Sequence, residues 1–131
     1  MTRPTKTGKK TTGKKTRKRP ALDFYRDEAG DPRARPTGGR SREKLAGFLE
    51  SDIQGSATTG LEILAALESV EAGRLREWTQ TGNAYTLILT PDGATLEPEA
   101  DEGEEATLLP LADLREAVTR WVEFLAGGAR H

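Results

Sequence analysis

The sequence contains no cysteine and a single histidine among 131 residues, and aromatic side chains make up only 5%. Without cysteine, disulfides, thiolate metal sites and thiol nucleophiles are all excluded. The histidine is His131, beyond the Gly127-Gly128 pair, so neither a Ser-His-Asp nor a Cys-His arrangement can be assembled inside the folded body. These deficits favour a protein that is not an enzyme, and no cofactor is expected.

Long apolar runs are also missing. No run approaches the ~20 residues that a membrane-spanning helix needs. Before Pro20 the only apolar side chain, apart from Pro4, is that of Met1, so the first residues lack the apolar core of a signal peptide. We therefore expect a cytoplasmic protein with no membrane partner; the oligomeric state stays open.

Charge is divided unevenly along the chain. Residues 1–20 contain nine Lys or Arg and no Asp or Glu, whereas the remaining 111 residues contain eleven basic and twenty-one acidic residues. The net charge of −1 is therefore the sum of a segment of +9 and a body of −10. The two parts call for separate interpretation.

The N-terminal segment, residues 1–20, is almost wholly Thr, Lys, Arg, Gly and Pro. It cannot bury enough apolar area to offset the entropy of ordering, so we predict a disordered tail before a single domain over residues 21–131. Its cations are expected to contact nucleic acid phosphates without sequence preference, because the segment has no aromatic residue. The predicted contacts are Lys9, Lys10, Lys14, Lys15, Arg17, Lys18 and Arg19. A solubilising leader and an arm folded back on the body are the alternatives.

The body shows strand and helix patterns in separate blocks. A first pair of strands, at Leu22–Arg26 and Arg33–Arg35, is followed by a helix with Ser41 as N-cap. A second helix, or a continuation of the first, spans about Thr58–Ala72. Turn sequences then separate further strands, predicted at Leu75–Gln80, Ala84–Thr90, Ala94–Glu97 and Thr107–Leu109. A terminal amphipathic helix spans Leu111 to Leu125.

This order predicts an α+β fold in which an antiparallel meander packs against two or three helices on one face. In the middle strand Tyr85, Leu87 and Leu89 share one face. Trp121 lies on the apolar stripe of the last helix and is predicted to be a core residue. Trp78 is either a core residue or a half-exposed anchor, and the large area that a tryptophan buries favours the core.

Residues 97–105 are strongly acidic, with Pro98 and Gly103 indicating a loop. The spacing does not match an EF-hand loop, which needs ligands at alternate positions and a final bidentate Glu, so a solvated loop is favoured over a metal site. We expect this loop to bind a basic protein partner, through Glu99, Asp101, Glu102, Glu104 and Glu105.

Several short motifs occur in order along the body: Leu22-Asp23-Phe24-Tyr25-Arg26-Asp27 with Gly30, then Trp78 with Gly82 and Ala84-Tyr85-Thr86-Leu87, then the helix from Leu111 to Phe124. Their order resembles that of the YacL family of small bacterial proteins. The resemblance covers residues 22–125, and Asn83-Ala84 departs from the more polar pair typical of that position. It implies a fold and a cytoplasmic bacterial setting, and no reaction. The same layout is similar to small immunity proteins that block secreted toxins.

Two functions follow as expectations. The first is a non-enzymatic binding module, whose acidic body engages a basic protein surface or whose tail holds it near nucleic acid. The second is an immunity-type inhibitor, whose acidic body occludes the phosphate-binding face of a toxin nuclease. An enzyme is disfavoured because the sequence offers no activated nucleophile or base.

Overall fold

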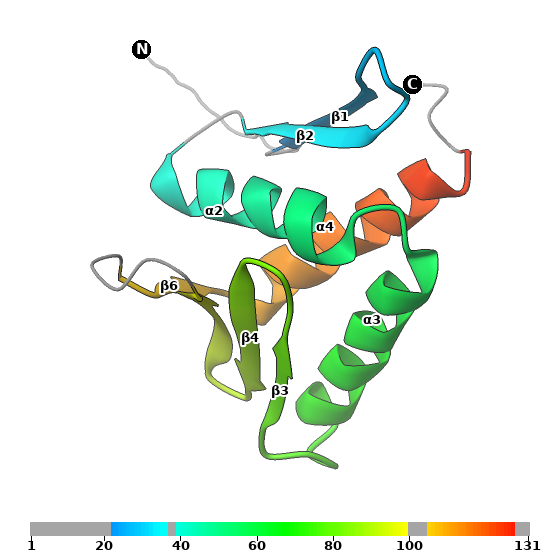
Figure 1. Ribbon diagram of the computed structural model, residues 1–131. Coiled ribbons are helices and arrows are strands. Elements are labelled where there is room, and N and C mark those ends of the chain that lie inside the picture. Colours follow the sequence, from blue (N-terminus) through cyan, green and yellow to red (C-terminus); the bar gives the residue numbers. More distant parts are fainter. Residues whose placement is uncertain (1–21, 37–38, 100–104, 128–131) are drawn as a thin grey trace, which may run out of the picture.

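The computed structural model describes residues 22–36, 39–99 and 105–127 (Figure 1). The predictions for residues 1–20 and for His131 lie outside these ranges. The elements are, in chain order, β1 (Leu22–Arg26), β2 (Pro32–Pro36), α2 (Arg40–Phe48), the π-helical turn η2 (Leu49–Ile53), α3 (Ala57–Glu71), β3 (Trp78–Thr81), β4 (Tyr85–Thr90), β5 (Gly93–Pro98), β6 (Thr107–Leu109) and α4 (Leu111–Leu125).

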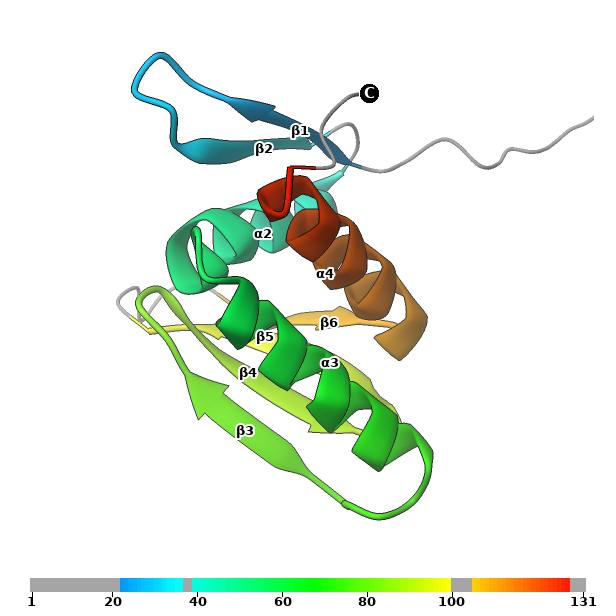
Figure 2. The same ribbon diagram turned by 90° about the vertical axis from the view of Figure 1, so that its right-hand side faces the viewer.

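The strands form two antiparallel sheets. β1 and β2 make a hairpin, and the other four strands make a meander in the order β3-β4-β5-β6. The helices α2 and α4 lie between the hairpin and the larger sheet, and α3 lies over the same face of that sheet (Figures 1 and 2). The predicted α+β fold, with a meander packed against helices on one face, is confirmed. The hairpin adds a third layer beyond the helices.

Alternation of side chains along β4 and β5 builds the core of the larger sheet. Leu87, Leu89, Ala94 and Leu96 point toward the helices and are 0% exposed. The opposite face carries mainly threonines and Ile88, which are partly exposed, and no described helix covers it (Figure 2). This alternation is the period of two that the sequence indicated for the middle strand.

The last helix supplies the centre of the core. Trp121 is 0% exposed, and its Nε1 donates a hydrogen bond of 2.9 Å to the carbonyl of Gln54. The ring of Phe24 meets it edge-on, with ring centroids 5.0 Å apart, so β1 is packed onto α4 through aromatic rings. The prediction that Trp121 is a core residue is confirmed.

The element boundaries depart from the sequence pattern at the start of α2 and at the start of β3. Helix α2 begins at Arg40 with Gly39 as its N-cap residue, so the prediction of Ser41 as N-cap is wrong. β3 begins at Trp78 and not at Leu75, because the N–H groups of Arg74 and Leu75 both donate to the carbonyl of Ser69. These two bonds satisfy a carbonyl at the C-terminal end of α3, which ends at Glu71, and hold Arg74 and Leu75 out of the strand.

The first helical stretch also changes its winding. After Phe48 the chain forms η2, which ends with a hydrogen bond of 2.8 Å from the N–H of Gln54 to the carbonyl of Leu49. Gln54 then takes a φ of 54°, which reverses the chain into α3. Wide turns of this kind often occur at functional positions, because they alter which side chains project from a helix.

None of the helices in the described ranges is long and apolar enough to cross a membrane.

Candidate functional site

The structure places only part of the predicted binding residues. Glu99 and Glu105 are exposed on either side of the loop between β5 and β6, and the hydroxyl of Thr86 donates to Glu99. The other acids predicted to bind a partner, Asp101, Glu102 and Glu104, lie outside the described residues, as do all seven residues predicted to contact nucleic acid. Their predictions stay open.

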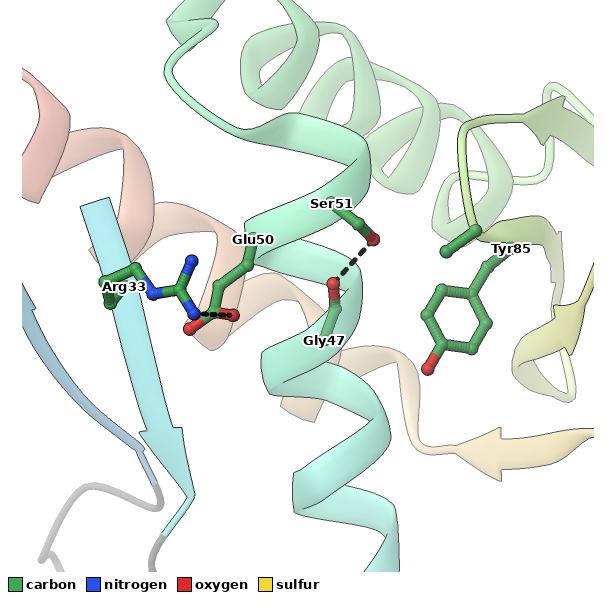
Figure 3. Close-up of a pocket in the computed structure, with 6 residues that line it drawn as sticks. Arg33, Gly47, Glu50, Ser51 and Tyr85 are labelled. Carbon is green, nitrogen blue, oxygen red and sulfur yellow. Dashed lines mark hydrogen bonds and ion pairs between the residues drawn. The ribbon is translucent and has the colours of Figure 1, made fainter. Parts of the chain in front are cut away.

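A cleft of about 380 Å³ lies between the hairpin and the larger sheet (Figure 3). The α2–η2 stretch forms its floor, β2 contributes one wall and the start of β4 contributes the other. Its lining residues are Arg33, Gly47, Glu50, Ser51, Ala84 and Tyr85. The cleft is therefore the place where all three layers meet.

Glu50 ties the floor of the cleft to the hairpin. Its Oε2 accepts a hydrogen bond of 2.6 Å from the N–H of Ala34, and its Oε1 lies 3.6 Å from Nη2 of Arg33. The Nε of Arg33 is also 3.9 Å from Oδ2 of Asp27. The carboxylate of Glu50 is thus engaged with β2 through both oxygens.

Asp52 ties the same floor to the larger sheet. Its Oδ1 accepts from the N–H of Ala84 at 2.8 Å, and its Oδ2 accepts from the N–H of Tyr85 at 3.1 Å. A Cβ at Gly82 would lie 2.5 Å from Oδ2 of Asp52, so the carboxylate fits only because that residue is glycine. The amide of Asn83 completes the contact by donating to the carbonyl of Ser51 at 2.8 Å. η2 therefore caps the turn between β3 and β4.

The hydroxyl groups of the cleft are the remaining candidates for chemistry. Burial, and to a lesser extent the charge of Asp52, raise the pKa of Tyr85 above its ordinary value of 10.0, so its phenol is neutral near pH 7 and is no base. The Oγ of Ser51 lies 2.6 Å from the carbonyl oxygen of Gly47 and 2.8 Å from Oδ1 of Asp52. Because Asp52 already accepts two backbone N–H groups, its geometry is that of a structural clamp.

A second groove, of about 470 Å³, runs between α3 and β3. Its lining residues are Glu62, Ala65, Ala66, Ser69, Leu75 and Trp78. Trp78 is half-buried and packs against the core, so of its two predicted roles the structure shows the half-exposed one. Leu75 is 37% exposed, and Leu61, one helical turn before Ala65, is 55% exposed. Small and apolar side chains thus surround a groove with an acidic rim.

Sequence reasoning singled out Trp78 but missed Glu50 and Asp52. Both acids lie far along the chain from the backbone groups that they bind, and only Gly82, next to a turn, gave a local sign of a close approach. Among the described residues, no group of three or more Asp, Glu or His side chains is placed to hold a metal ion.

Comparison with protein-family models, with curated proteins and with solved structures finds no match to this chain. The resemblance to the YacL family stays a prediction.

Proposed function

We propose that this chain is a non-catalytic binding protein of the cytoplasm, whose N-terminal segment contacts nucleic acid and whose acidic body binds a basic protein. One observation carries the proposal, the separation of charge along the chain. Residues 1–44 contain fifteen basic and five acidic residues, whereas residues 45–131 contain five basic and sixteen acidic residues. A protein with two such poles can hold a polyanion at one end and a polycation at the other.

The geometry of the cleft supports binding over catalysis. Glu50 and Asp52, the two carboxylates there, accept backbone N–H groups from β2 and from the start of β4. Either carboxylate would have to release those groups to act as a general base, which would leave donors unsatisfied in a partly buried joint. The positions of Glu50 and Asp52 are explained by these hydrogen bonds, which join the helices to the two sheets.

Many acidic side chains of the body are exposed to solvent. Exposed acidic residues lie along α3, before β3 and around the end of β5, at Glu62, Glu68, Glu77, Glu97 and Glu99. Glu71, also on α3, forms an ion pair with Arg115. Exposed acidic residues of this number attract a cationic partner and influence its orientation.

The test of the nucleic-acid contact is a fluorescence titration of a labelled duplex at several salt concentrations, with the full chain and with a chain that lacks residues 1–19. If all nine cations met phosphates, log affinity against log salt would have a slope near about −8, and a shallower slope is expected from a flexible segment. The truncated chain should not bind. Equal binding by both chains, or binding that ignores salt, would contradict the proposal.

An immunity-type inhibitor is the second candidate, favoured by the acids that flank the β5–β6 loop. Glu99 and Glu105 are both exposed there, where they would face the phosphate-binding surface of a nuclease. The test is inhibition of DNA cleavage by any toxin nuclease that is encoded beside this chain, with Glu99→Gln/Glu105→Gln as the weakened variant. Cleavage that proceeds at the same rate with and without the protein would exclude this role for that nuclease.

A further inference from the structure

The outer edge of β2 is closed to another strand. The N–H of Ala34 bonds to Glu50 and not to β1, so Ala34 and its alternate neighbours, Pro32 and Pro36, direct their backbone groups outward. The two prolines have no N–H, and the N–H of Ala34 is already engaged. This edge therefore has no donor to offer, which is how many proteins prevent unwanted strand pairing.

The outer edge of β3 has the opposite character. β3 is the terminal strand of the larger sheet. The N–H of Gly82 donates a hydrogen bond of 2.8 Å to the carbonyl of Tyr85, and this bond shows which residues of β3 are hydrogen-bonded to β4. By alternation Trp78 and Gln80 bond to β4, and Thr79 and Thr81 direct their N–H and carbonyl groups away from the sheet. Within the described ranges, no further hydrogen bond reaches these backbone groups.

The groove between α3 and β3 lies beside this open edge. Trp78 pairs with Leu89, whose side chain is buried under the helices, so Trp78 faces α3 and forms one wall of the groove. The opposite wall is formed by α3, where the small side chains of Ala65 and Ser69 leave space for a ligand side chain. A strand added to β3 would direct every second side chain toward the helical face, where this groove begins.

We propose that the β3 edge and the α3–β3 groove bind an extended segment of another protein by strand addition. The segment places an aliphatic or aromatic side chain against Trp78 and Leu75 in the groove, and at alternate positions a Lys or Arg on the opposite face, beside Glu77, whose carboxylate accepts a hydrogen bond from the Thr79 hydroxyl. Main-chain hydrogen bonds to Thr79 and Thr81 hold the backbone, and the groove selects the side chain. The inference rests on the proposed function of a binding protein and names the surface and the kind of partner.

Charge selects the occupant of the groove. Residues 62–77 contain four acidic and two basic residues, and both Glu62 and Glu77 are exposed. A second copy of the chain would bring two such acidic stretches together, which costs free energy. The chain's own N-terminal segment has suitable charge, but before Pro20 its apolar side chains are only Met1 and Pro4, so it lacks an anchor for the groove. A basic segment with an apolar residue satisfies both requirements.

The first test measures the binding of synthetic peptides to the full-length, unmodified chain. Labelled synthetic peptides that alternate Lys with Val, Ile or Phe are titrated with the protein by fluorescence anisotropy, beside a matched series in which Glu replaces Lys. Each binding peptide is then made with N-methyl groups on alternate backbone nitrogens, in either of the two phases. We expect the Lys series to bind, the Glu series not to bind, and only one phase of methylation to abolish binding. Absence of binding by the Lys series, or equal effects of both phases, would overturn strand addition.

The second test changes the protein. Thr79→Pro removes an outward N–H without removing a bond to β4, and Ala65→Trp fills the groove from α3. Each is expected to weaken peptide binding about tenfold or more, with the thermal midpoint near that of the parent. Thr95→Val, on the uncovered face of β5, is the matched control and should bind as the parent does. If Thr79→Pro does not fold, Ala65→Trp carries the test, and unchanged binding by Ala65→Trp overturns the site.

Sedimentation of the same variants decides between a peptide and a second copy. The parent is expected to stay monomeric without peptide, whereas a dimer that Thr79→Pro dissociates would assign the edge to self-association and overturn the proposal. Duplex binding by residues 1–20 is measured in parallel and should be equal in the parent and in Ala65→Trp. Absence of duplex binding by the parent would count against the proposed function alone, and absence of peptide binding by the parent would count against the docking surface alone.

Discussion

β2 and β3 each form the outer edge of a sheet, and they differ in what they leave for a partner. β2 reads Pro-Arg-Ala-Arg-Pro and offers no outward donor, because two of its three outward residues are prolines and the third bonds to Glu50. β3 reads Trp-Thr-Gln-Thr and leaves the backbone of Thr79 and Thr81 without a partner among the described residues. Within one small domain, one edge is protected from strand pairing and another is left available for it.

The α2–η2 stretch couples these two edges. It sends Glu50 to the hairpin and, two residues later, Asp52 to the turn that ends β3. Both carboxylates satisfy backbone N–H groups in other elements, so one stretch of helix fixes the position of both sheets. Because residues two apart in a helix project to nearly opposite sides, Glu50 reaches β2 and Asp52 reaches the start of β4.

The largest effect should come from the core beneath the hairpin. Trp121→Ala removes the ring that Phe24 packs on and leaves the carbonyl of Gln54 without its donor. We expect a loss of about 3–5 kcal/mol in the free energy of unfolding, measured by urea denaturation. Trp78→Ala is the matched control and should cost less, because Trp78 is only half-buried. Equal losses would show that both tryptophans belong to one core.

The next effect should come from the clamp on the β3–β4 turn. Asp52→Ala leaves the N–H groups of Ala84 and Tyr85 without their acceptor, for a cost of about 2–3 kcal/mol in the free energy of unfolding. Asp92→Ala, in the exposed turn between β4 and β5, should stay within about 0.5 kcal/mol of the parent. A small effect at Asp52 would mean that the turn holds its shape by its own sequence.

A smaller effect on stability, with a distinct effect on association, should follow when the closed edge is opened. Glu50→Ala frees the N–H of Ala34 and removes a partner of Arg33, for a cost of about 1–2 kcal/mol. The freed donor should make the protein associate at high concentration, which sedimentation would detect. Glu43→Ala, at an exposed position in the first turn of α2, is the control and should remain monomeric. A monomeric Glu50→Ala protein would show that the prolines alone close the edge.

Local patterns predicted most of this fold. The period of two in Tyr85–Thr90 and the apolar stripe of Leu111–Leu125 gave the central strand and the last helix at nearly the observed bounds. The errors occur where hydrogen bonds outside the periodic pattern decide the boundary, as at Arg74 and Leu75, whose N–H groups bond to the C-terminal end of α3 and so lie outside β3.

The candidate sites were harder to predict because their contacts are long-range. Asp52 acts on residues more than thirty positions away, and Glu50 acts on Ala34, sixteen positions earlier. An acidic residue in a helix indicates a solvated face unless the partner is known. The edge of β3 was equally hidden, because which backbone groups face outward depends on the register with β4.

The smallest effect concerns the phenol at the wall of the cleft. Burial, with a smaller contribution from Asp52, raises the pKa of Tyr85 above 10.0, so the folded state favours the neutral phenol more than the unfolded chain does. Its contribution to stability is therefore complete below pH 10 and is lost as pH rises through the raised pKa of the folded state. Above pH 10 the free energy of unfolding should fall more steeply with pH in the parent than in Tyr85→Phe.

Urea denaturation at a series of alkaline pH values measures this difference, and difference absorbance between the parent and Tyr85→Phe reports the ionisation itself. Asp52→Asn removes the smaller cause of the shift and keeps an oxygen near the turn, so in that variant the pKa of Tyr85 should fall part of the way toward its ordinary value. If the parent and Tyr85→Phe lose stability in parallel above pH 10, the phenol is solvated in solution and the cleft is wider than the clamp at Asp52 implies.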